Sequence, residues 1–236
     1  MQPPAVHPSG QLPADYPWQF KKTADGSDTL YNHNFGQYYH SIFGARQETQ
    51  RVFVELGLQY AFDLFEQVNL LEVGFGTGFN AWATALEATE KQRQVSYTGL
   101  EPYPVKMEAI NMLKNFSEND VLDKFNYEDL HSLSWDQCHI VNDFFSFEKR
   151  KTTLQDHAAD KRYNLIYYDA FAPVSQPELW TVEVFKKITD LLVDGGILTT
   201  YCAKGFVQRN LKAAGFKVEK HPGPPRKREV IRAILT

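Results

Sequence analysis

The hydrophobic residues of this chain follow two spacings that alternate along its length. Runs of consecutive apolar and β-branched residues at 70–73, 95–101 and 163–169 are typical of strands that are buried on both faces. Stretches such as 45–65 and 179–192 instead place apolar residues three or four positions apart, which is the spacing of an amphipathic helix. Strands that alternate with helices predict an α/β fold with a mostly parallel, doubly wound sheet.

The remaining elements follow from the same two spacings. They are helices over 105–116, 121–130 and 205–214, and strands over 138–141, 197–202, 216–220 and 229–235. A short proline-rich connection joins the last two strands, so we expect an antiparallel hairpin at the end of the sheet. Gly57 is a weak point in the helix at 45–65, and the pattern that begins at Ser175 is typical of a capping box for the helix at 179–192.

Polar and turn-forming segments divide the chain further. The turn residues at 25–28 predict a small hairpin, and the charged stretch 146–161 predicts an insertion or mobile loop. Residues 1–17 are polar and rich in proline, as expected of a flexible arm. We expect 18–66 to form a hairpin and helical extension packed on the core, and 67–236 to form the main domain.

Composition narrows the class of protein. No apolar run approaches the roughly 18 residues that span a bilayer, and the N-terminus lacks the apolar core of a secretory signal, so we expect a cytoplasmic protein without a membrane partner. A net charge of −4 argues against general binding of polyanions.

Cys138 and Cys202 lie in apolar runs and are expected to be buried thiols. The histidines lack the spacing of metal ligands; we expect no metal, and read His40 and His131 as ordinary surface or loop residues.

A glycine-rich loop follows the strand at 70–73 and opens the next helix; it reads Glu72-Val73-Gly74-Phe75-Gly76-Thr77-Gly78-Phe79-Asn80. Glycine lets the chain turn sharply and lets the backbone approach a bulky ligand, towards which the helix points its unpaired N–H groups. The spacing differs from the G-x-G-x-x-G of dinucleotide sites, and an acid precedes the loop. This form resembles the first motif of class I S-adenosylmethionine-dependent methyltransferases, whose cationic ligand gains from a nearby carboxylate. A tight turn without a ligand is the alternative.

Two further acids end strands of the predicted sheet. Glu101 ends the second strand, where an acid accepts hydrogen bonds from ribose hydroxyls, and Pro102 stops the strand there. Asp169 ends a later strand, and ligands of open α/β sheets bind at such carboxyl ends. If a methyl group is transferred to an amine, a carboxylate there attracts the ammonium form and helps to remove its proton. A solvated acid at Glu101 and a loop-capping aspartate at Asp169 are the alternatives.

Basic residues are concentrated near the end of the chain. Between Lys204 and Arg232 there are nine lysines and arginines and only two acids. The candidates for contact with nucleic-acid phosphates are Lys204, Arg226, Lys227 and Arg228. A solvated face is the alternative reading of this charge.

Longer motifs carry a more specific resemblance. They are Asp25-Gly26-Ser27, Tyr39-His40-Ser41 with Gly44 and Glu48, Asp169-Ala170-Phe171-Ala172-Pro173, Pro177-Glu178-Leu179-Trp180-Thr181, Thr200-Tyr201-Cys202-Ala203-Lys204-Gly205 and Pro222-Gly223-Pro224-Pro225-Arg226-Lys227-Arg228-Glu229. Together with the glycine loop they resemble the methyltransferase domain of the bifunctional MnmC family and its stand-alone MnmD-type relatives. Those enzymes form 5-methylaminomethyl-2-thiouridine at the wobble position of tRNA.

The resemblance implies a class I methyltransferase fold, S-adenosylmethionine as cofactor, the tRNA anticodon stem-loop as partner and Asp169 as the catalytic residue. The expected cofactor-binding residues are Glu72, Gly74, Phe75, Gly76, Thr77, Gly78, Asn80, Glu101, Pro102, Asp143 and Phe144. The chain carries no second glycine fingerprint for a flavin, so we expect only the methylation step, with a separate enzyme supplying the aminomethyl precursor. An aminopropyltransferase acting on a small amine, and a non-catalytic cofactor-binding partner of tRNA-modifying enzymes, remain alternatives.

Overall fold

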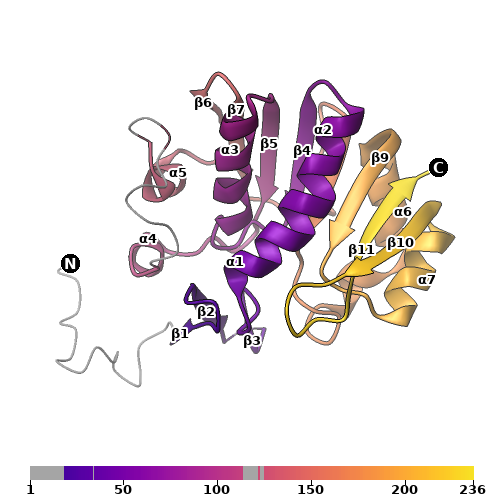
Figure 1. The fold of residues 1–236 in the computed structure, drawn as a ribbon, viewed down its shortest axis with the longest axis horizontal. Coiled ribbons are helices and arrows are strands. Elements are labelled where there is room, and N and C mark those ends of the chain that lie inside the picture. Colours follow the sequence, from indigo (N-terminus) through magenta and orange to yellow (C-terminus); the bar gives the residue numbers. More distant parts are fainter. Residues whose placement is uncertain (1–18, 34, 114–121, 123–124) are drawn as a thin grey trace.

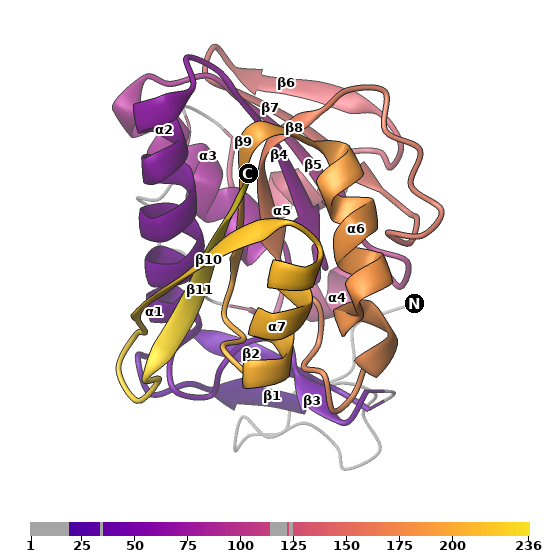
Figure 2. The same cartoon turned by 90° about the vertical axis from the view of Figure 1, so that its right-hand side faces the viewer.

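The computed structural model describes residues 19–33, 35–113, 122 and 125–236. The arm predicted at 1–17 lies outside these residues, as do parts of the helices predicted at 105–116 and 121–130. Within the described part, a large sheet forms the centre of the molecule and helices cover both of its faces (Figures 1 and 2).

The sheet has eight strands, five of them parallel. The parallel strands are β7 (Phe145–Arg150), β5 (Val95–Leu100), β4 (Val68–Val73), β8 (Tyr163–Tyr168) and β9 (Leu192–Thr200), in that spatial order. The antiparallel strands are β6 (Cys138–Asn142) beside β7, and the hairpin of β10 (Phe216–Pro222) and β11 (Glu229–Leu235) beside β9. The predicted doubly wound, mostly parallel sheet with a terminal hairpin is confirmed.

Two layers of helices enclose the sheet. One layer contains α3 (Phe79–Lys91) and a continuous helix of α1 (Ala45–Glu48), the π-helical η1 (Thr49–Gln59) and α2 (Tyr60–Leu64) (Figure 1). The other layer contains α6 (Val182–Leu191) and α7 (Gly205–Ala213) (Figure 2). The short elements α4 (Met107–Ile110), α5 (Tyr127–Ser132) and the 3-10 turn η2 (Pro177–Trp180) lie in connections between the main elements.

The central strands divide their side chains between two hydrophobic cores, because successive residues of a strand face opposite sides. On β8, Leu165 and Tyr167 belong to the core beneath α3 and η1, whereas Ile166 and Tyr168 belong to the core beneath α6 and α7. All four side chains are completely buried. Burial on both faces therefore explains the unbroken apolar runs in the sequence.

A small separate sheet lies beyond the carboxyl ends of the parallel strands (Figure 1). It consists of β1 (Gln19–Lys22), β2 (Asp28–Asn32) and β3 (Gln37–Tyr38). The β1–β2 hairpin predicted from the turn at 25–28 is confirmed. Asp25 secures this turn, since its carboxylate accepts from the backbone N–H groups of Ser27 at 3.1 Å and Gln47 at 3.0 Å. The second of these bonds joins the small sheet to the start of the long helix.

The loop predicted at 146–161 is wrong in its first part, because this part belongs to β7. Phe145, Phe147 and Lys149 point inward and are almost fully buried, while the residues between them are partly exposed. This is the period of two that a half-covered strand requires. The ammonium of Lys149 lies 4.9 Å from the centre of the Trp135 ring. A charged residue at an inward position concealed the strand pattern in the sequence.

Two predictions about helices also differ from the structure. Helix α6 begins after Thr181, whose hydroxyl accepts from the backbone N–H of Val184 at 3.4 Å, so the capping box at Ser175 is wrong. Residues after Ser175 form the 3-10 turn instead. Gly57 does not interrupt the long helix, which continues through it to Leu64.

The two cysteines differ in environment. Cys202 is buried as predicted, but Cys138 is exposed because it lies on the edge strand β6. Among the residues that the structure describes, no helix has the length and apolar character needed to cross a membrane.

Glu72 places a carboxyl group inside the sheet. Its side chain, on β4, has no exposed surface. One carboxyl oxygen accepts from the Asn80 amide at 2.8 Å and the other from the Tyr97 hydroxyl at 2.6 Å. Burial nevertheless outweighs these two hydrogen bonds and raises the pKa of Glu72 to about 8.

This raised pKa predicts a specific dependence of stability on pH. Between the usual pKa of a glutamate and about 8, the folded protein holds a proton on Glu72 that the unfolded chain releases. The free energy of unfolding should therefore fall as pH rises, by up to about 1.4 kcal/mol per pH unit. Glu72→Gln keeps the acceptor for Asn80 and turns the amide N–H groups towards the Tyr97 hydroxyl, which can accept from them, but it cannot ionise. The variant should therefore gain stability relative to wild type between about pH 5.5 and about pH 8. Urea denaturation measures this difference.

The exposed Glu90→Gln is the matched control for the same substitution. If the difference in free energy of unfolding between wild type and Glu72→Gln stays constant over this pH range, Glu72 is ionised throughout it, and its raised pKa is wrong.

Candidate active site

A cavity of about 260 Å³ opens at the carboxyl ends of the parallel strands, and we call it the first cavity. Ligands of open α/β sheets bind at this edge. The walls come from the loops after β4, β5, β7 and β8 and from the N-terminal segment that carries Tyr39 and His40. The predicted site residues that line it are Gly74, Phe75, Gly76, Thr77, Asn80, Glu101, Pro102 and Asp169.

The glycine loop forms one wall of the first cavity by close backbone contact. Gly74 has a φ of 93°, and a Cβ atom there would lie 2.6 Å from the carbonyl oxygen of Asp169. Gly76 has a φ of 53°, and its Cβ would lie 2.9 Å from Cδ1 of Tyr39. Both positions therefore require glycine for conformation and for space.

Glu101 faces this loop from the end of β5. One carboxylate oxygen accepts from the Gly76 N–H at 2.9 Å and the other from the Tyr103 N–H at 2.9 Å. Burial raises the pKa of Glu101, and these two backbone hydrogen bonds oppose the shift. A carboxylate has about four acceptor positions. Two of them remain available to a ligand's hydroxyl groups in the cavity.

Two histidines contact the glycine loop at Thr77. The Nε2 of His131 donates to the Thr77 carbonyl at 2.8 Å, and the Nε2 of His40 lies 3.2 Å from the Thr77 hydroxyl. Burial lowers the pKa of His131 to about 3 and that of His40 to about 4, so both rings are neutral at physiological pH. Their prediction as ordinary surface or loop residues is wrong, because the contacts join segments far apart in the sequence.

Asn80 connects the glycine loop to the acid at the end of β8. Its amide nitrogen donates to Glu72 at 2.8 Å and to Asp169 at 2.8 Å, and its oxygen accepts from the Thr49 hydroxyl at 2.6 Å. Glu72 lies behind Asn80 and does not line the first cavity, so the prediction of direct contact with a ligand is not supported by its position. Gly78 also lies outside the lining and precedes α3 with a φ of 71°.

A second cavity, of about 410 Å³, adjoins the first. The two share the residues Tyr39, His40, Asp169, Ala170 and Phe171. Aromatic rings dominate the shared wall, where Phe171 lies 5.3 Å from Tyr39, measured between ring centres. Asp169 therefore lies at the junction of two spaces, each of which can hold a different reactant.

The environment of Asp169 favours its protonated form. Burial raises the pKa of this carboxyl well above its usual range, and the charges of Glu72 and Glu48 add to the shift. The hydrogen bond from Asn80 and the charge of Lys227 act in the opposite direction. A carboxyl group in such surroundings accepts a proton more readily than one in water.

The structure does not bring Asp143 and Phe144 to either cavity. They form the turn between β6 and β7, and the Phe144 carbonyl accepts from the N–H of Val95 at the opposite end of β5. Their assignment to the cofactor site is corrected. The strand that lies parallel to β5 is β7, and the carboxyl end of β7 comes later in the chain than these two residues. The residues at that end, missed in the sequence, are Thr152, Thr153, Leu154 and Gln155.

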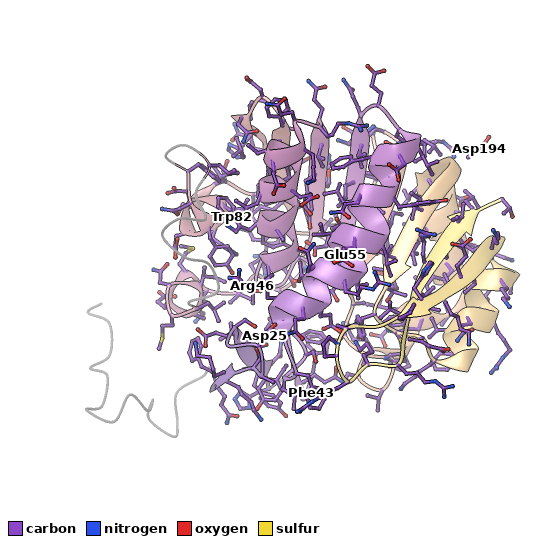
Figure 3. All side chains as sticks on the ribbon, in the orientation of Figure 1. Asp25, Phe43, Arg46, Glu55, Trp82 and Asp194 are labelled. Carbon is purple, nitrogen blue, oxygen red and sulfur yellow. The ribbon has the colours of Figure 1, made fainter. Side chains whose placement is uncertain are left out.

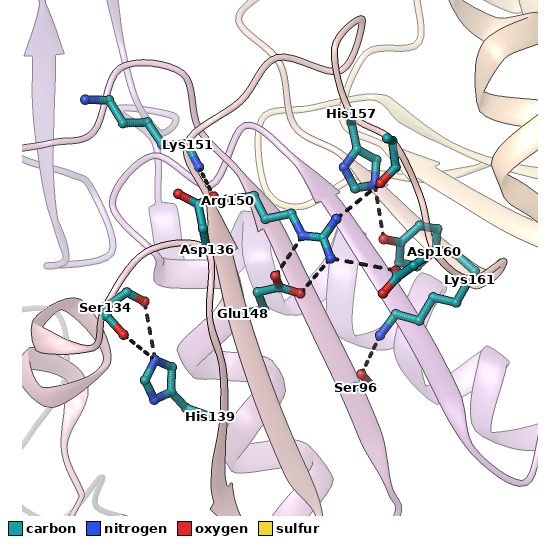
Figure 4. A network of polar contacts seen from close by, with 12 residues as sticks. Ser96, Ser134, Asp136, His139, Glu148, Arg150, Lys151, His157, Asp160 and Lys161 are labelled. Carbon is teal, nitrogen blue, oxygen red and sulfur yellow. Dashed lines mark hydrogen bonds and ion pairs between the residues drawn. The ribbon is translucent and has the colours of Figure 1, made fainter.

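Ionic contacts fix the loop that supplies those missed residues (Figure 4). Arg150, at the end of β7, pairs with Glu148 at 2.8 Å and with Asp160 at 3.7 Å. Lys161 donates to the hydroxyl of Ser96 on β5 at 2.7 Å. The segment predicted as a mobile loop is thus joined to the sheet at both of its ends.

Three of the four predicted tRNA-binding cations are exposed, namely Lys204, Arg226 and Arg228. The guanidinium of Arg226 lies 5.4 Å from the centre of the Phe43 ring. Phe43 is itself 45% exposed and lies near the β10–β11 connection (Figure 3). These cations are therefore accessible to a large partner.

Lys227 differs from its neighbours. Its ammonium forms an ion pair with Glu48 and lies 4.5 Å from the centre of the Tyr201 ring. All three side chains line the second cavity. The structure therefore separates Lys227 from the exposed cations beside it.

Comparisons with known proteins agree with this architecture. A family model described as S-adenosyl-L-methionine-dependent methyltransferase matches residues 144–236. The tRNA 5-methylaminomethyl-2-thiouridine biosynthesis bifunctional protein MnmC of Pseudoalteromonas atlantica is 28% identical over 224 residues, covering 86% of this chain and 31% of that protein. MnmC of Pseudomonas savastanoi pv. phaseolicola is 29% identical over 217 residues, covering 86% of this chain and 32% of that protein. The chain spans about a third of the length of these relatives.

Solved structures extend the comparison. The crystal structure of MnmC2 from Aquifex aeolicus matches with a TM-score of 0.74 at 24% identity, covering 95% of this chain and 72% of that one. Spermidine synthase from Thermotoga maritima matches with a TM-score of 0.54 at 12% identity, covering 94% of this chain and 80% of that one. Identities this low show the fold alone, which is the class I methyltransferase fold. Residues 144–236 match the methyltransferase family model, and most of this chain is similar to about a third of the length of the MnmC relatives.

Proposed function

We propose that this protein is an S-adenosylmethionine-dependent methyltransferase that acts on the wobble uridine of tRNA. Its substrate would be the aminomethyl group of 5-aminomethyl-2-thiouridine, and its product 5-methylaminomethyl-2-thiouridine, the modification named in the relatives' descriptions. The observation that carries the proposal is the position of Asp169 at the junction of the two cavities. The cytoplasmic location and a separate enzyme that supplies the aminomethyl group stay predictions.

In this proposal the first cavity holds the cofactor. Glu101 accepts hydrogen bonds from the ribose hydroxyls, and the backbone of Gly74 and Gly76 passes close beside the ligand because neither carries a side chain. Pro102 and the segment 152–155 complete the wall. When bound, S-adenosylmethionine supplies an electrophilic methyl group.

Asp169 prepares the amine. A primary alkylamine is mostly protonated at neutral pH and then has no lone pair for attack. The Asp169 carboxylate attracts the ammonium, orients its N–H bonds and takes the proton. Its raised pKa makes the ionised carboxylate a stronger base, and the Asn80 hydrogen bond, the Lys227 charge and the bound ammonium itself favour the ionised form. The hydrogen bond from Asn80 fixes the carboxylate at the junction.

A direct assay tests the proposal. Purified protein, S-adenosylmethionine and tRNA that carries 5-aminomethyl-2-thiouridine should yield the methylaminomethyl nucleoside, detected by mass spectrometry of digested tRNA. Transfer of an aminopropyl group from the decarboxylated cofactor would support the aminopropyltransferase alternative instead. Cofactor binding without turnover on either substrate would support the non-catalytic alternative.

The first prediction concerns cofactor affinity. Glu101→Ala removes the carboxylate that accepts from the ribose, so binding of S-adenosylmethionine should weaken by about 1.5–3 kcal/mol. Isothermal titration calorimetry measures the loss, and the exposed Glu90→Ala is the control. Unchanged affinity would show that Glu101 does not hold the ribose.

The second prediction concerns turnover. Asp169→Asn keeps the size of the side chain but loses the group that takes the amine proton, so kcat should fall by about 10²–10⁴-fold while cofactor affinity changes little. Single-turnover methylation of tRNA and calorimetry measure the two effects. Asp194→Asn, exposed at the end of the molecule opposite Phe43 (Figure 3), is the control. Normal methylation by Asp169→Asn would refute the proposed proton transfer.

The third prediction concerns the RNA. Arg226→Ala/Arg228→Ala removes two exposed cations beside the second cavity, so tRNA binding should weaken. The slope of log affinity against log salt should decrease by about one unit for each phosphate that the variant no longer neutralises. Lys91→Ala/Arg162→Ala, at the opposite edge of the sheet, should leave the slope unchanged. Equal affinity and slope in both double variants would place the RNA elsewhere.

A further inference from the structure

The second cavity combines aromatic walls with a paired acid and base. Its aromatic lining includes Phe171, Tyr39, Phe43 and Tyr201. Flat aromatic rings are the usual partners of an unstacked nucleobase. The volume of about 410 Å³ lies within the range of small-molecule pockets.

The ion pair of this cavity comes from two distant parts of the chain. Glu48 ends α1, and Lys227 lies in the connection between β10 and β11. Their side chains are only 12% and 28% exposed, so both charges are largely removed from water. Burying such a pair gives little net stability by itself. A role in ligand recognition accounts for its place in a cavity wall.

Neither group is saturated by the contacts it makes within the protein. The Lys227 ammonium has three donor hydrogens and uses one for Glu48. The Glu48 carboxylate accepts from Lys227 and from the Ser41 N–H at 3.3 Å, which leaves about two of its acceptor positions. The pair therefore presents a donor next to an acceptor, with no net charge.

This combination disfavours a phosphate and favours a neutral polar ring. Glu48 lines the cavity beside Lys227, and its carboxylate would repel an anion placed there. A uracil-type base carries a carbonyl oxygen on the ring carbon next to its 5-substituent, and an N–H group one position further. That order of acceptor and donor is complementary to Lys227 followed by Glu48.

We propose that the Lys227–Glu48 pair reads the edge of the target pyrimidine, with Lys227 donating to the 4-oxo group and Glu48 accepting from the adjacent ring N–H. This inference rests on the proposed function, since it places the 5-aminomethyl group at Asp169. A cytosine base presents an amino group and an unprotonated nitrogen at the same two positions, so the pair rejects it. Lys227 thereby serves specificity, while Arg226 and Arg228 serve the RNA backbone.

The test compares two matched double variants. Lys227→Met/Glu48→Gln removes both charges together, so that no unpaired charge remains buried. The control, Lys220→Met/Glu229→Gln, makes the same changes in a more exposed ion pair of the same hairpin, whose charged atoms lie 2.9 Å apart and whose side chains are 50% and 32% exposed. Substrates are anticodon stem-loops with 5-aminomethyl-2-thiouridine or 5-aminomethylcytidine at the wobble position. The readouts are kcat/KM for methylation, S-adenosylmethionine affinity, melting temperature and the salt slope of RNA binding.

We expect the Lys227→Met/Glu48→Gln variant to lose about 10- to 100-fold in kcat/KM on the uridine substrate and to lose the preference for uridine over cytidine. Cofactor affinity, melting temperature and salt slope should match those of the control.

Three results would overturn the inference while the proposed function stands. The first is an unchanged preference for uridine. The second is a decreased salt slope, which would make Lys227 a phosphate contact. The third is an equal loss of kcat/KM on both substrates together with a lower melting temperature, which would make the pair structural. Failure of the wild-type protein to methylate the uridine substrate would refute the proposed function and the inference with it.

Discussion

The arrangement of the candidate active site depends on the side-chain amide of Asn80. Glu72 and Asp169 are two buried acids close enough for one to raise the pKa of the other, and the hydrogen bond from Asn80 opposes this shift at Asp169. The Asn80 nitrogen donates to both, and its oxygen accepts from Thr49. Because every polar atom of the Asn80 side chain has a partner, the network holds Asp169 in one orientation where the two cavities meet.

The N-terminal segment completes this site and is part of it. Tyr39 and His40 line both cavities, although they precede the glycine loop by more than thirty residues. The absence of a side chain at Gly76 leaves room for the Tyr39 ring. Phe35 also stacks on Phe171 at 4.8 Å between ring centres. The small sheet therefore determines the shape of the cavities as directly as the parallel strands do.

Electrostatics separate two tasks in the basic segment near the C-terminus. Exposed Arg226 and Arg228 retain a charge that an RNA backbone can neutralise. Lys227 is compensated by Glu48 inside the second cavity, where a bare cation would be costly and a neutral donor–acceptor pair is suited to a base. A net charge of −4 over the whole chain is compatible with this local arrangement.

The sequence by itself determined the alternating strands, the glycine loop and the acids Glu101 and Asp169 at strand ends, because burial on both faces and close backbone approach restrict residue choice locally. Only the tertiary structure decided that β7, with its inward lysine, is the third parallel strand, which removes Asp143 from the site. It also decided that His40 holds the glycine loop and that Lys227 faces a cavity. These roles arise from contacts between residues far apart in the chain, and no local pattern of hydrophobic and polar positions encodes such contacts.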